Sequence, residues 1–222
     1  NINFHANGGT GTMSVQSAST GETKALSQNQ FTRSGYTFAG WSTTPTGAVE
    51  YTDQAQYTMG TDSSYTLYAV WTPIQYSISY NLGGGTDMGN QEQYNIESDK
   101  ITLIAPTRSG YVFAGWTGEG ITEPTKDVSI TTGSIGNKTY TAVWAATVHF
   151  HANGGEGTIA SVTVVTNTSE YVLPKHTYTR DGYLFDGWSL SANGSLAFEK
   201  ESVFTCGADG EYHLYAVWTE GT

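Results

Sequence analysis

Histidines are the side chains of this sequence best placed to do chemistry. His149 and His151 stand in the run Val148-His149-Phe150-His151, whose alternation predicts a β-strand. Because alternate side chains of a strand share a face, both imidazoles would point the same way and offer two metal ligands. A cysteine or carboxylate at ligand spacing nearby is missing, so we expect neither a metal site nor a cofactor. The other histidines are His5, His176 and His213.

The single cysteine, Cys206, excludes a disulfide within the chain. It could serve as a reactive thiol, as an intermolecular link or as a small hydrophobic side chain, and we expect the last, with Cys206 partly buried. Lys24, Lys100 and Lys175 are candidates for a self-formed Lys–Asn isopeptide crosslink. Their positions do not align between the repeated segments described below, which disfavours crosslinks, and the intact mass would reveal each bond as one lost ammonia.

Signatures of catalysis are sparse. Gly83-Gly84-Gly85 leads into Asp87 with no lysine after it, unlike a phosphate-binding loop. The sequence holds no nucleophile elbow, and no set of Ser, His and Asp recurs from one repeat to the next. We therefore expect no enzyme and no catalytic residue, and the sequence identifies no ligand-binding residue.

Charge and hydropathy exclude two classes of partner. With 9 basic and 20 acidic residues the net charge is −11, which repels nucleic acid and anionic membrane surfaces. Apolar runs of roughly 20 residues, as a membrane span needs, do not occur, so we expect no membrane insertion. The sequence begins at Asn1 with neither an initiator Met nor a signal peptide. We expect it to be a piece of a longer protein.

Three copies of one pattern organise the chain. The first landmark is a strand that runs into a glycine turn, the second is a Gly-Tyr-x-Phe-x-Gly-Trp motif after Thr-Arg, and the third is a strand that ends in Val-Trp. These landmarks occupy 2–9, 78–85 and 148–155, then 35–41, 110–116 and 182–188, then 67–71, 140–144 and 214–218. All six tryptophans belong to the second and third landmarks, so we expect them to form the cores.

The repeats predict three small domains, 1–72, 73–145 and 146–222. Their closing tryptophans, Trp71, Trp144 and Trp218, recur after 73 and 74 residues. Two or three residues join each closing tryptophan to the next first strand, which is far shorter than a flexible linker. We therefore expect a fairly stiff, elongated array.

Alternation in the first repeat predicts strands near 2–6, 12–18, 35–41 and 65–71, with a weak short helix over 23–30. Segment 51–59 is expected to be irregular or a short edge strand. Asp186 takes the position of Ala39 in the third motif, so that face of the strand should look outward. Strict alternation would then expose the tryptophan as well. A bulge at the second glycine would return it to the core, so we expect bulges at Gly40, Gly115 and Gly187.

The landmarks together resemble the Listeria–Bacteroides repeat, the B-repeat family of internalin B and other bacterial surface proteins. The signature is Thr-Arg-Ser-Gly-Tyr-Thr-Phe-Ala-Gly-Trp at 32–41 with Leu-Tyr-Ala-Val-Trp at 67–71, and it returns in all three repeats. Repeat 2 departs most, with Asn81-Leu82-Gly83 for His-Ala-Asn and a shorter loop after Trp116. The resemblance implies a mostly β or α+β chain of three tandem β-grasp-like (ubiquitin-like) domains, and it implies no catalytic residues.

We therefore expect a non-enzymatic, extracellular module of a bacterial surface or secreted protein. As a monomeric part of a larger protein, it would act as a semi-rigid stalk or spacer that displays a binding domain. The alternative is that the repeats are adhesins that bind a host-surface protein or glycan. Tyr51, Tyr57 and Tyr171 differ between repeats and could serve as exposed aromatic contacts. An enzymatic role is the third alternative.

Overall fold

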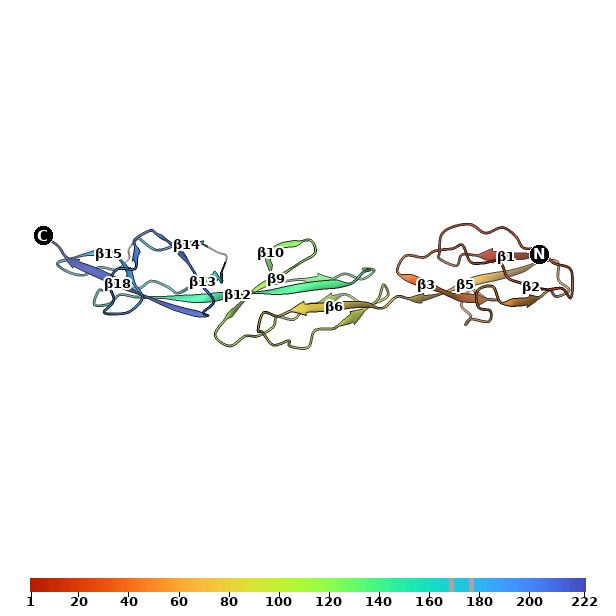
Figure 1. Ribbon diagram of the computed structural model, residues 1–222, viewed down its shortest axis with the longest axis horizontal. Helices are drawn as coiled ribbons and strands as arrows, with labels where there is room; N and C mark the ends of the chain where they lie inside the picture. Colours follow the sequence, from red (N-terminus) through yellow and green to blue (C-terminus); the bar gives the residue numbers. More distant parts are fainter. Residues whose placement is uncertain (168–169, 176–177) are drawn as a thin grey trace. The chain divides into compact units, whose positions relative to one another are not determined.

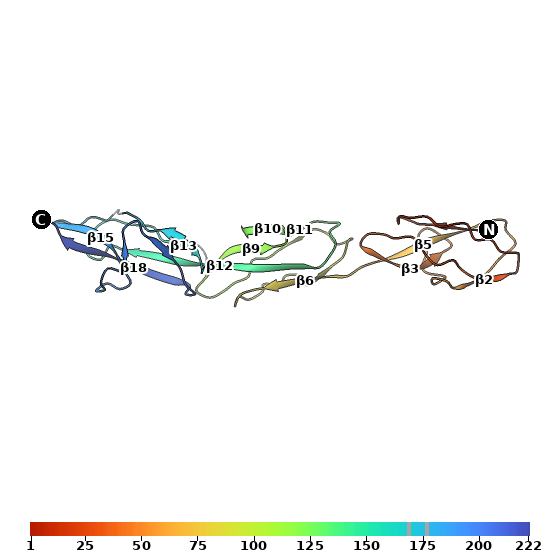
Figure 2. The ribbon, with the colours of Figure 1, turned by 45° about the horizontal axis from the view of Figure 1, so that its top comes forward.

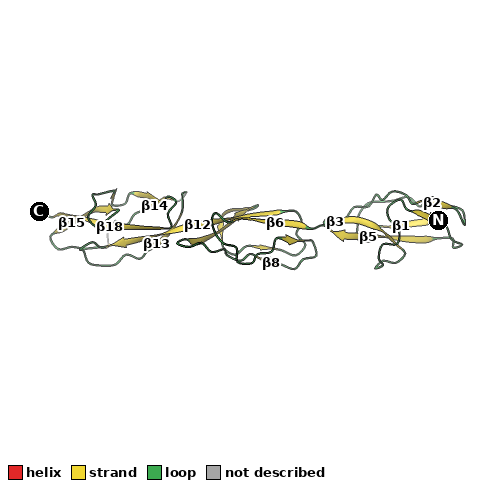
Figure 3. Cartoon of the chain, turned by 60° about the horizontal axis from the view of Figure 1, so that its bottom comes forward, coloured by secondary structure: helices red, strands yellow, loops and turns green. Residues whose placement is uncertain are grey.

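The computed structural model describes residues 1–167, 170–175 and 178–222, and every regular element in that part of the chain is a β-strand (Figure 3). Repeat 1 contains β1 (Ile2–His5), β2 (Thr23–Ala25), β3 (Tyr36–Ser42), β4 (Gln56–Thr58) and β5 (Tyr65–Pro73). Repeat 2 contains β6 (Tyr76–Asn81), β7 (Gln93–Tyr94), β8 (Ile101–Thr102), β9 (Val112–Gly118), β10 (Ile121–Thr125), β11 (Ser129–Ile130) and the first part of β12 (Lys138–His151). Repeat 3 contains the rest of β12, β13 (Val162–Val165), β14 (Glu170–Val172), β15 (Tyr183–Ser189), β16 (Phe198–Glu199), β17 (Val203–Thr205) and β18 (Glu211–Glu220). His176 lies outside the described residues.

Contacts divide the chain into two compact units whose boundaries do not coincide with the repeats. Unit 1 comprises 1–77, 92–101 and 130–137, and unit 2 comprises 78–91, 102–129 and 138–222. Unit 1 therefore holds repeat 1 with part of repeat 2, and unit 2 holds the rest of repeat 2 with repeat 3. As a result, each junction between consecutive repeats lies inside a unit.

The first and last strands of each repeat are neighbours and run in the same direction. In repeat 1 the sheet order is β1–β5–β3, with β5 parallel to β1 and antiparallel to β3. In unit 2, β12 is parallel to β6 and antiparallel to β9, and β18 is parallel to β12 and antiparallel to β15. The three repeats thus share one core arrangement of strands.

Strand β12 belongs to two repeats at once. Its first part pairs with β6 and β9, and its second part pairs with β13 and β18 (Figures 1 and 2). It carries Trp144, the closing tryptophan of repeat 2, and then Val148, which lies in the core of repeat 3. Ala145 and Ala146, at the crossover, are both buried. The strand therefore passes from one repeat to the next without a break.

The predicted bulges are confirmed in all three motifs. The register of β3 on β5 shifts between Phe38 and Gly40, and that of β15 on β18 shifts between Phe185 and Gly187. In repeat 2, Val143 and Trp144 of β12 pair with Gly115 and Phe113 of β9, so Ala114 is the extra residue. The motif tryptophans that follow, Trp41, Trp116 and Trp188, are all 0 % exposed. The extra residue has reversed the side-chain phase, as expected.

Two expectations for repeat 1 were wrong. The weak helix over 23–30 is absent, because Thr23–Ala25 forms strand β2 and pairs with β4 instead. A helix this short is unstable by itself, whereas the pairing supplies backbone partners for both segments. The strand expected over 12–18 is reduced to an isolated bridge between Gln16 and Ile2. The short edge strand expected within 51–59 is β4.

Each closing tryptophan packs on the glycine turn of its own repeat. The indole N–H of Trp71 donates to the carbonyl of Ala6 at 2.9 Å, and Trp144 and Trp218 make the same bond to Leu82 and Ala152. A Cβ on Gly9 would lie 2.6 Å from the Trp71 ring. A Cβ on Gly85 would lie 2.4 Å from the Trp144 ring, and one on Gly155 would lie 2.4 Å from the Trp218 ring. The ring needs this close approach, which explains the second glycine of the turn.

Candidate functional site

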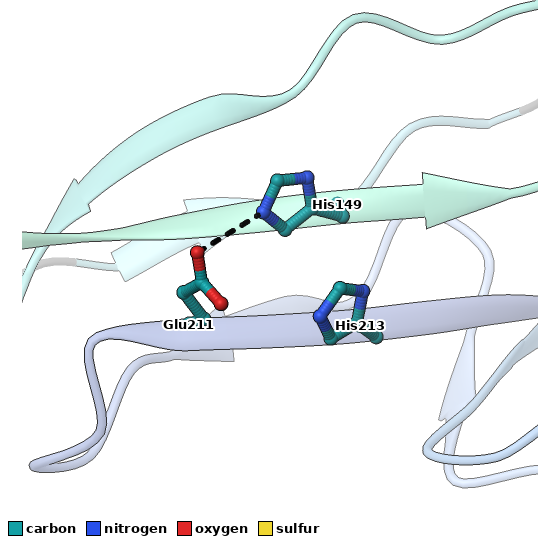
Figure 4. A group of neighbouring side chains, drawn as sticks. All are labelled: His149, Glu211 and His213. Atoms are coloured by element: carbon teal, nitrogen blue, oxygen red, sulfur yellow. Dashed lines mark ion pairs between the residues drawn. The ribbon is translucent and has the colours of Figure 1, made fainter. Parts of the chain in front are cut away.

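The densest group of chemically active side chains in the described residues is a histidine cluster on the outer face of repeat 3. Parallel pairing of β12 with β18 sets His149 opposite His213 and Thr147 opposite Glu211. The Thr147 N–H donates to the Gly210 carbonyl at 2.9 Å, which anchors the start of β18 in this register. His149, Glu211 and His213 therefore project from one face, two from β18 and one from β12 (Figure 4).

The three side chains approach each other through their polar atoms. Nε2 of His149 lies 3.9 Å from Oε1 of Glu211. The rings of His149 and His213 stack, with centroids 4.8 Å apart and planes inclined by 13°. One potential ligand atom from each of the three residues lies within 4.8 Å of the others. The group thus offers two imidazole nitrogens and a carboxylate oxygen, a donor set that suits first-row divalent metals.

Two further residues hold the rings of this cluster in place. Nδ1 of His149 lies 3.0 Å from the hydroxyl oxygen of Ser161, and Nδ1 of His213 lies 2.9 Å from Nε2 of His151. His151 stacks in turn on Tyr215, with ring centroids 4.5 Å apart. Burial lowers the pKa of His151, and the neighbouring His213 and His149 lower it further.

The sequence pattern identified one of the three residues of this cluster, His149, together with the adjoining His151. It placed His149 and His151 on one strand face, as observed, but Glu211 and His213 lie more than 60 residues further along and reach His149 only through the parallel pairing. The signal that could have found them was the alternation of the closing strand. Alternation puts His213 on the face opposite the core residue Leu214, and parallel pairing of the first and last strands would have placed it beside His149.

A second feature is a cavity in unit 2 that opens beside Gly83. The corresponding residues, Asn7 and Asn153, adopt φ of 49° and donate from their side chains to the carbonyls of Ala69 and Ala216, both at 2.9 Å. Gly83 lacks this side chain. The open cavity next to it measures about 550 Å³ and is lined by residues that include Arg108, Thr117, Glu123, Trp144 and Val165. The corresponding hollow beside Asn7 in repeat 1 measures about 230 Å³.

The arginine of each Thr-Arg motif has a common structural role. The guanidinium carbon lies over the ring of the following tyrosine in every repeat, 3.9 Å from the centroid of Tyr36 for Arg33. Arg108 and Arg180 cover Tyr111 and Tyr183 at 3.6 and 3.9 Å. These cation–π contacts fix the chain just before the motif strand, so the arginines serve the fold of each repeat.

Sequence comparison identifies the family. The profile of the Listeria-Bacteroides repeat domain matches residues 1–70 and 147–217, and that of the divergent InlB B-repeat domain matches 76–148. The chain belongs to the Listeria–Bacteroides repeat family. It consists of three tandem repeats, of which the middle one is the divergent member.

Relatives of this Listeria–Bacteroides repeat chain occur in bacterial proteins that are much longer. It is 28% identical over 89% of its length to a protein of Evansella cellulosilytica described as a Gly-rich membrane protein. A second protein of that organism, described as a membrane protein, is 30% identical over 68% of the chain. Internalin H of Listeria monocytogenes is 33% identical over 38% of the chain. The chain spans 22%, 23% and 15% of these relatives.

Repeats of this family are internalin-type surface-protein repeats, which are typically not enzymes. Among the described residues of the chain, no helix is long and apolar enough to cross a membrane.

Several residues singled out in the sequence can now be placed in the Listeria–Bacteroides repeats. Cys206 is buried, as expected, although completely rather than partly: it is 0 % exposed in the core of repeat 3, and burial raises the pKa of its thiol. Lys24 and Lys175 lie at the surface and pair with Glu22 and Glu201 at 2.9 and 4.0 Å. Lys100 is also exposed.

The tyrosines expected to be exposed were wrongly placed. Tyr57 is only 7% exposed and belongs to the core of repeat 1, where its ring packs edge-on against Tyr51. Tyr51 and Tyr171 are half-buried and pack against the cores of their own repeats. The physical reason is size, because a domain of about 73 residues needs every large ring it has to complete its core.

Proposed function

We propose that the three repeats form a semi-rigid stalk or spacer that holds a binding domain of a larger bacterial surface protein away from the cell. The observation that carries the proposal is the continuous strand β12. Its backbone is hydrogen-bonded on both sides of the boundary between repeats 2 and 3, including four register pairs with β13 from Ala145 to Val148. Bending at this point would break ladder bonds between buried residues, which opposes free rotation.

Contacts across both repeat boundaries support the same proposal. Within unit 1, the Ile74 N–H donates to the Gly35 carbonyl at 2.9 Å, and the Tyr36 hydroxyl donates to Glu97 at 2.9 Å. A Cβ on Gly35 would lie 2.7 Å from Ile96, so the turn of repeat 1 packs closely on a loop of repeat 2. Within unit 2, the Tyr111 hydroxyl donates to the Ala208 carbonyl of repeat 3.

The parallel pairing of first and last strands suits a chain under tension. A pull on the two ends of a repeat would drag these neighbouring strands past one another, for example β1 against β5. All the hydrogen bonds between them would then be loaded together, in shear, instead of one after another. This arrangement recurs in β6 with β12 and in β12 with β18.

We also infer that each repeat is a reduced β-grasp-like domain. Support comes from the sheet of repeat 1, where a last strand lies between a parallel first strand and an antiparallel neighbour. An experimental structure of the chain, superposed on ubiquitin-like domains, tests the inference. Failure of β1, β3 and β5 to superpose in the same order and direction would overturn it.

Small-angle X-ray scattering of the chain tests the stalk. A compact globule of 222 residues would have a radius of gyration of about 17 Å, and we expect a value well above it. A matched variant with a flexible Gly/Ser linker between Ala145 and Ala146 should show a broader distribution of interatomic distances. A wild-type radius near the globular value would refute the proposal, as would a distribution that the linker leaves unchanged.

The cavity beside Gly83 favours a second candidate function, adhesion to a host protein or glycan. A hollow of about 550 Å³ with an aromatic wall, a guanidinium and a carboxylate suits a polar ligand that has one apolar face. A glycan array and a pull-down from host-cell surfaces test this function. Binding that is weakened by Arg108→Ala and by Gly83→Asn, which fills part of the hollow, would support adhesion at this place. Binding unaffected by both would place the ligand elsewhere.

A further inference from the structure

The strand register of repeat 3 gathers three ligand side chains where the other repeats have none. His149, Glu211 and His213 correspond to Asn3, Ser64 and Thr66 in repeat 1, where the side-chain amide of Asn3 donates to the Ser64 hydroxyl at 2.8 Å. In repeat 2 the corresponding residues are Ser79, Asn137 and Thr139. The same place on the fold thus carries neutral polar side chains in two repeats and two imidazoles with a carboxylate in the third.

Hydrogen bonding orients both rings of this group for metal binding. Metal-bound histidines usually engage their second ring nitrogen with another polar group, which fixes the tautomer. Here Nδ1 of His149 lies at 3.0 Å from Ser161 and Nδ1 of His213 at 2.9 Å from Nε2 of His151. With both Nδ1 atoms protonated and donating, the Nε2 atoms carry free lone pairs. Each ring turns one nitrogen toward the Glu211 carboxylate (Figure 4).

We propose that His149, Glu211 and His213 bind one first-row divalent metal ion, with Zn²⁺ as the probe. Two imidazoles and one carboxylate suit zinc and its neighbours better than Ca²⁺ or Mg²⁺, which take oxygen ligands. Three protein ligands leave a fourth tetrahedral position for water. The net charge of −11 adds a general attraction for cations.

The ligand atoms need only a small adjustment to close around an ion. Metal–ligand bonds of about 2.0–2.1 Å at tetrahedral angles place the ligand atoms roughly 3.3–3.5 Å from one another. The three ligand atoms here lie within 4.8 Å of one another. His149 and Glu211 have side chains that are 32% and 63% exposed, so rotation of their side chains can close the gap. The expectation of no metal site rested on the local sequence, in which neither β18 residue is near His149.

The ion would join β12 to β18, the parallel first and last strands of repeat 3. Because the ligands meet only when β12 and β18 are paired in this register, the ion would bind the folded repeat and not the separated strands. Binding should therefore stabilise repeat 3 selectively. The inference does not depend on the stalk proposal, although a clamp at this place would resist the same sliding motion.

Isothermal titration calorimetry of the untagged chain, freed of metal with a chelator and kept near pH 7.5, tests the proposal. We expect one Zn²⁺ per chain with micromolar affinity. His149→Ala and His213→Ala should each weaken binding by at least about tenfold, and Glu211→Gln should weaken it by less. His5→Ala, at the position of His151 in repeat 1, is the matched control and should change nothing. Absence of zinc binding at millimolar metal would overturn the site. So would His149→Ala and His213→Ala variants that bind zinc as tightly as the wild-type chain.

Nuclear magnetic resonance of the wild-type chain keeps the test decisive if a variant fails to fold. Zinc should shift the Nε2 resonances of His149 and His213 and leave both rings protonated at Nδ1, while His5 stays unperturbed. Co²⁺ should give the visible bands of a tetrahedral nitrogen–oxygen site without thiolate charge transfer, because Cys206 is buried in the core. Shifts confined to other residues, or a thiolate spectrum, would contradict the proposal.

Discussion

At the scale of single residues, one glycine decides which way each motif tryptophan faces. Gly40, Gly115 and Gly187 have backbone φ angles of 150°, 138° and 155°, values that residues other than glycine rarely adopt. The bulge that each glycine permits turns the next residue inward. A buried tryptophan contributes a few kcal/mol through the area it removes from water, which is comparable to the whole net stability of a small domain.

Gly40→Ala should therefore destabilise repeat 1 strongly. A Cβ at this position would lie 2.5 Å from the Tyr51 carbonyl oxygen and 2.6 Å from Val49, in addition to the unfavourable φ. We expect a loss of about 2–4 kcal/mol in the free energy of unfolding of repeat 1. Hydrogen exchange of repeat 1 amides measures this loss of stability, with repeat 3 as the internal reference.

Gly21→Ala, with φ of 77° and open space around its Cβ, is the control and should cost only about 1 kcal/mol. Equal losses would show that the bulge is not the cause.

Glu50 gives repeat 1 a pH dependence that repeat 3 lacks at the matching position, Ala197. Hydrogen bonds from the backbone N–H and hydroxyl of Thr43 and from the Ser42 hydroxyl hold the pKa of Glu50 below its usual range. A carboxyl pKa that is lower in the folded state stabilises the fold at pH values above the unfolded-state pKa of about 4.3. This contribution is lost as pH falls through the folded-state pKa.

Glu50→Gln should thus lower the stability of repeat 1 at neutral pH and have no effect in strong acid. Hydrogen exchange near neutral pH and urea unfolding in acid check this, and a larger effect in acid would contradict it.

At the scale of elements, the turn after the first strand distinguishes repeat 2 from repeats 1 and 3. Asn153 closes its turn by donating to the carbonyls of Ala192 and Ala216, both at 2.9 Å. Asn7 does the same to Pro45 and Ala69. Gly83 keeps the left-handed conformation, with φ of 58°, but ties the turn to no neighbouring strand through a side chain. The difference leaves the cavity beside Trp144.

Reciprocal substitutions at this turn should have opposite effects. Asn153→Gly removes one half-buried hydrogen bond, to Ala216, and one exposed hydrogen bond, to Ala192, and should cost repeat 3 about 1–2 kcal/mol. Gly83→Asn places a residue that tolerates this conformation opposite the Ala142 carbonyl, and we expect it to stabilise repeat 2 by up to about 1 kcal/mol. Its Cβ would come 3.3 Å from Nε1 of Trp144, which requires only a slight shift. Thermal unfolding with hydrogen exchange measures both changes. Destabilisation by both would show that the asparagine is not the element that repeat 2 lacks.

At the scale of the whole chain, three repeats share parallel terminal strands and closely packed boundaries, and the mechanical consequence can be measured. Stretching the chain from its two termini should load each parallel pair in shear and give three separate unfolding events at high force.

The matched control pulls on an antiparallel pair of the same repeat. In a Cys206→Ala chain, handles on Leu184→Cys and Glu220→Cys would load β15 and β18, in which Tyr183 stands opposite Glu220. Here the hydrogen bonds open one after another, so unfolding should occur at a clearly lower force. Single-molecule force spectroscopy compares the two geometries. Equal forces would refute the shear argument.

The sequence alone determined the number of repeats, the core role of the six tryptophans, the bulge before each motif tryptophan and the family. These follow from local properties. Alternation assigns side chains to a strand face, and a charged residue such as Asp186 shows which face meets water. Its carboxylate accepts a hydrogen bond from the Thr219 hydroxyl on the neighbouring strand. Local pattern also explains the failure at 23–30, where a weak helical preference was overridden by pairing with β4.

Only the tertiary structure decided which strands lie side by side. It made β12 one strand of two repeats, buried Tyr57 and opened the cavity beside Gly83. It also brought Glu211 and His213 to His149. Strand partners are set by long-range pairing and by competition for the few positions around a small core, and alternation carries no information about either. The histidine cluster therefore appears in the sequence as separated residues and becomes a potential site only where β12 meets β18.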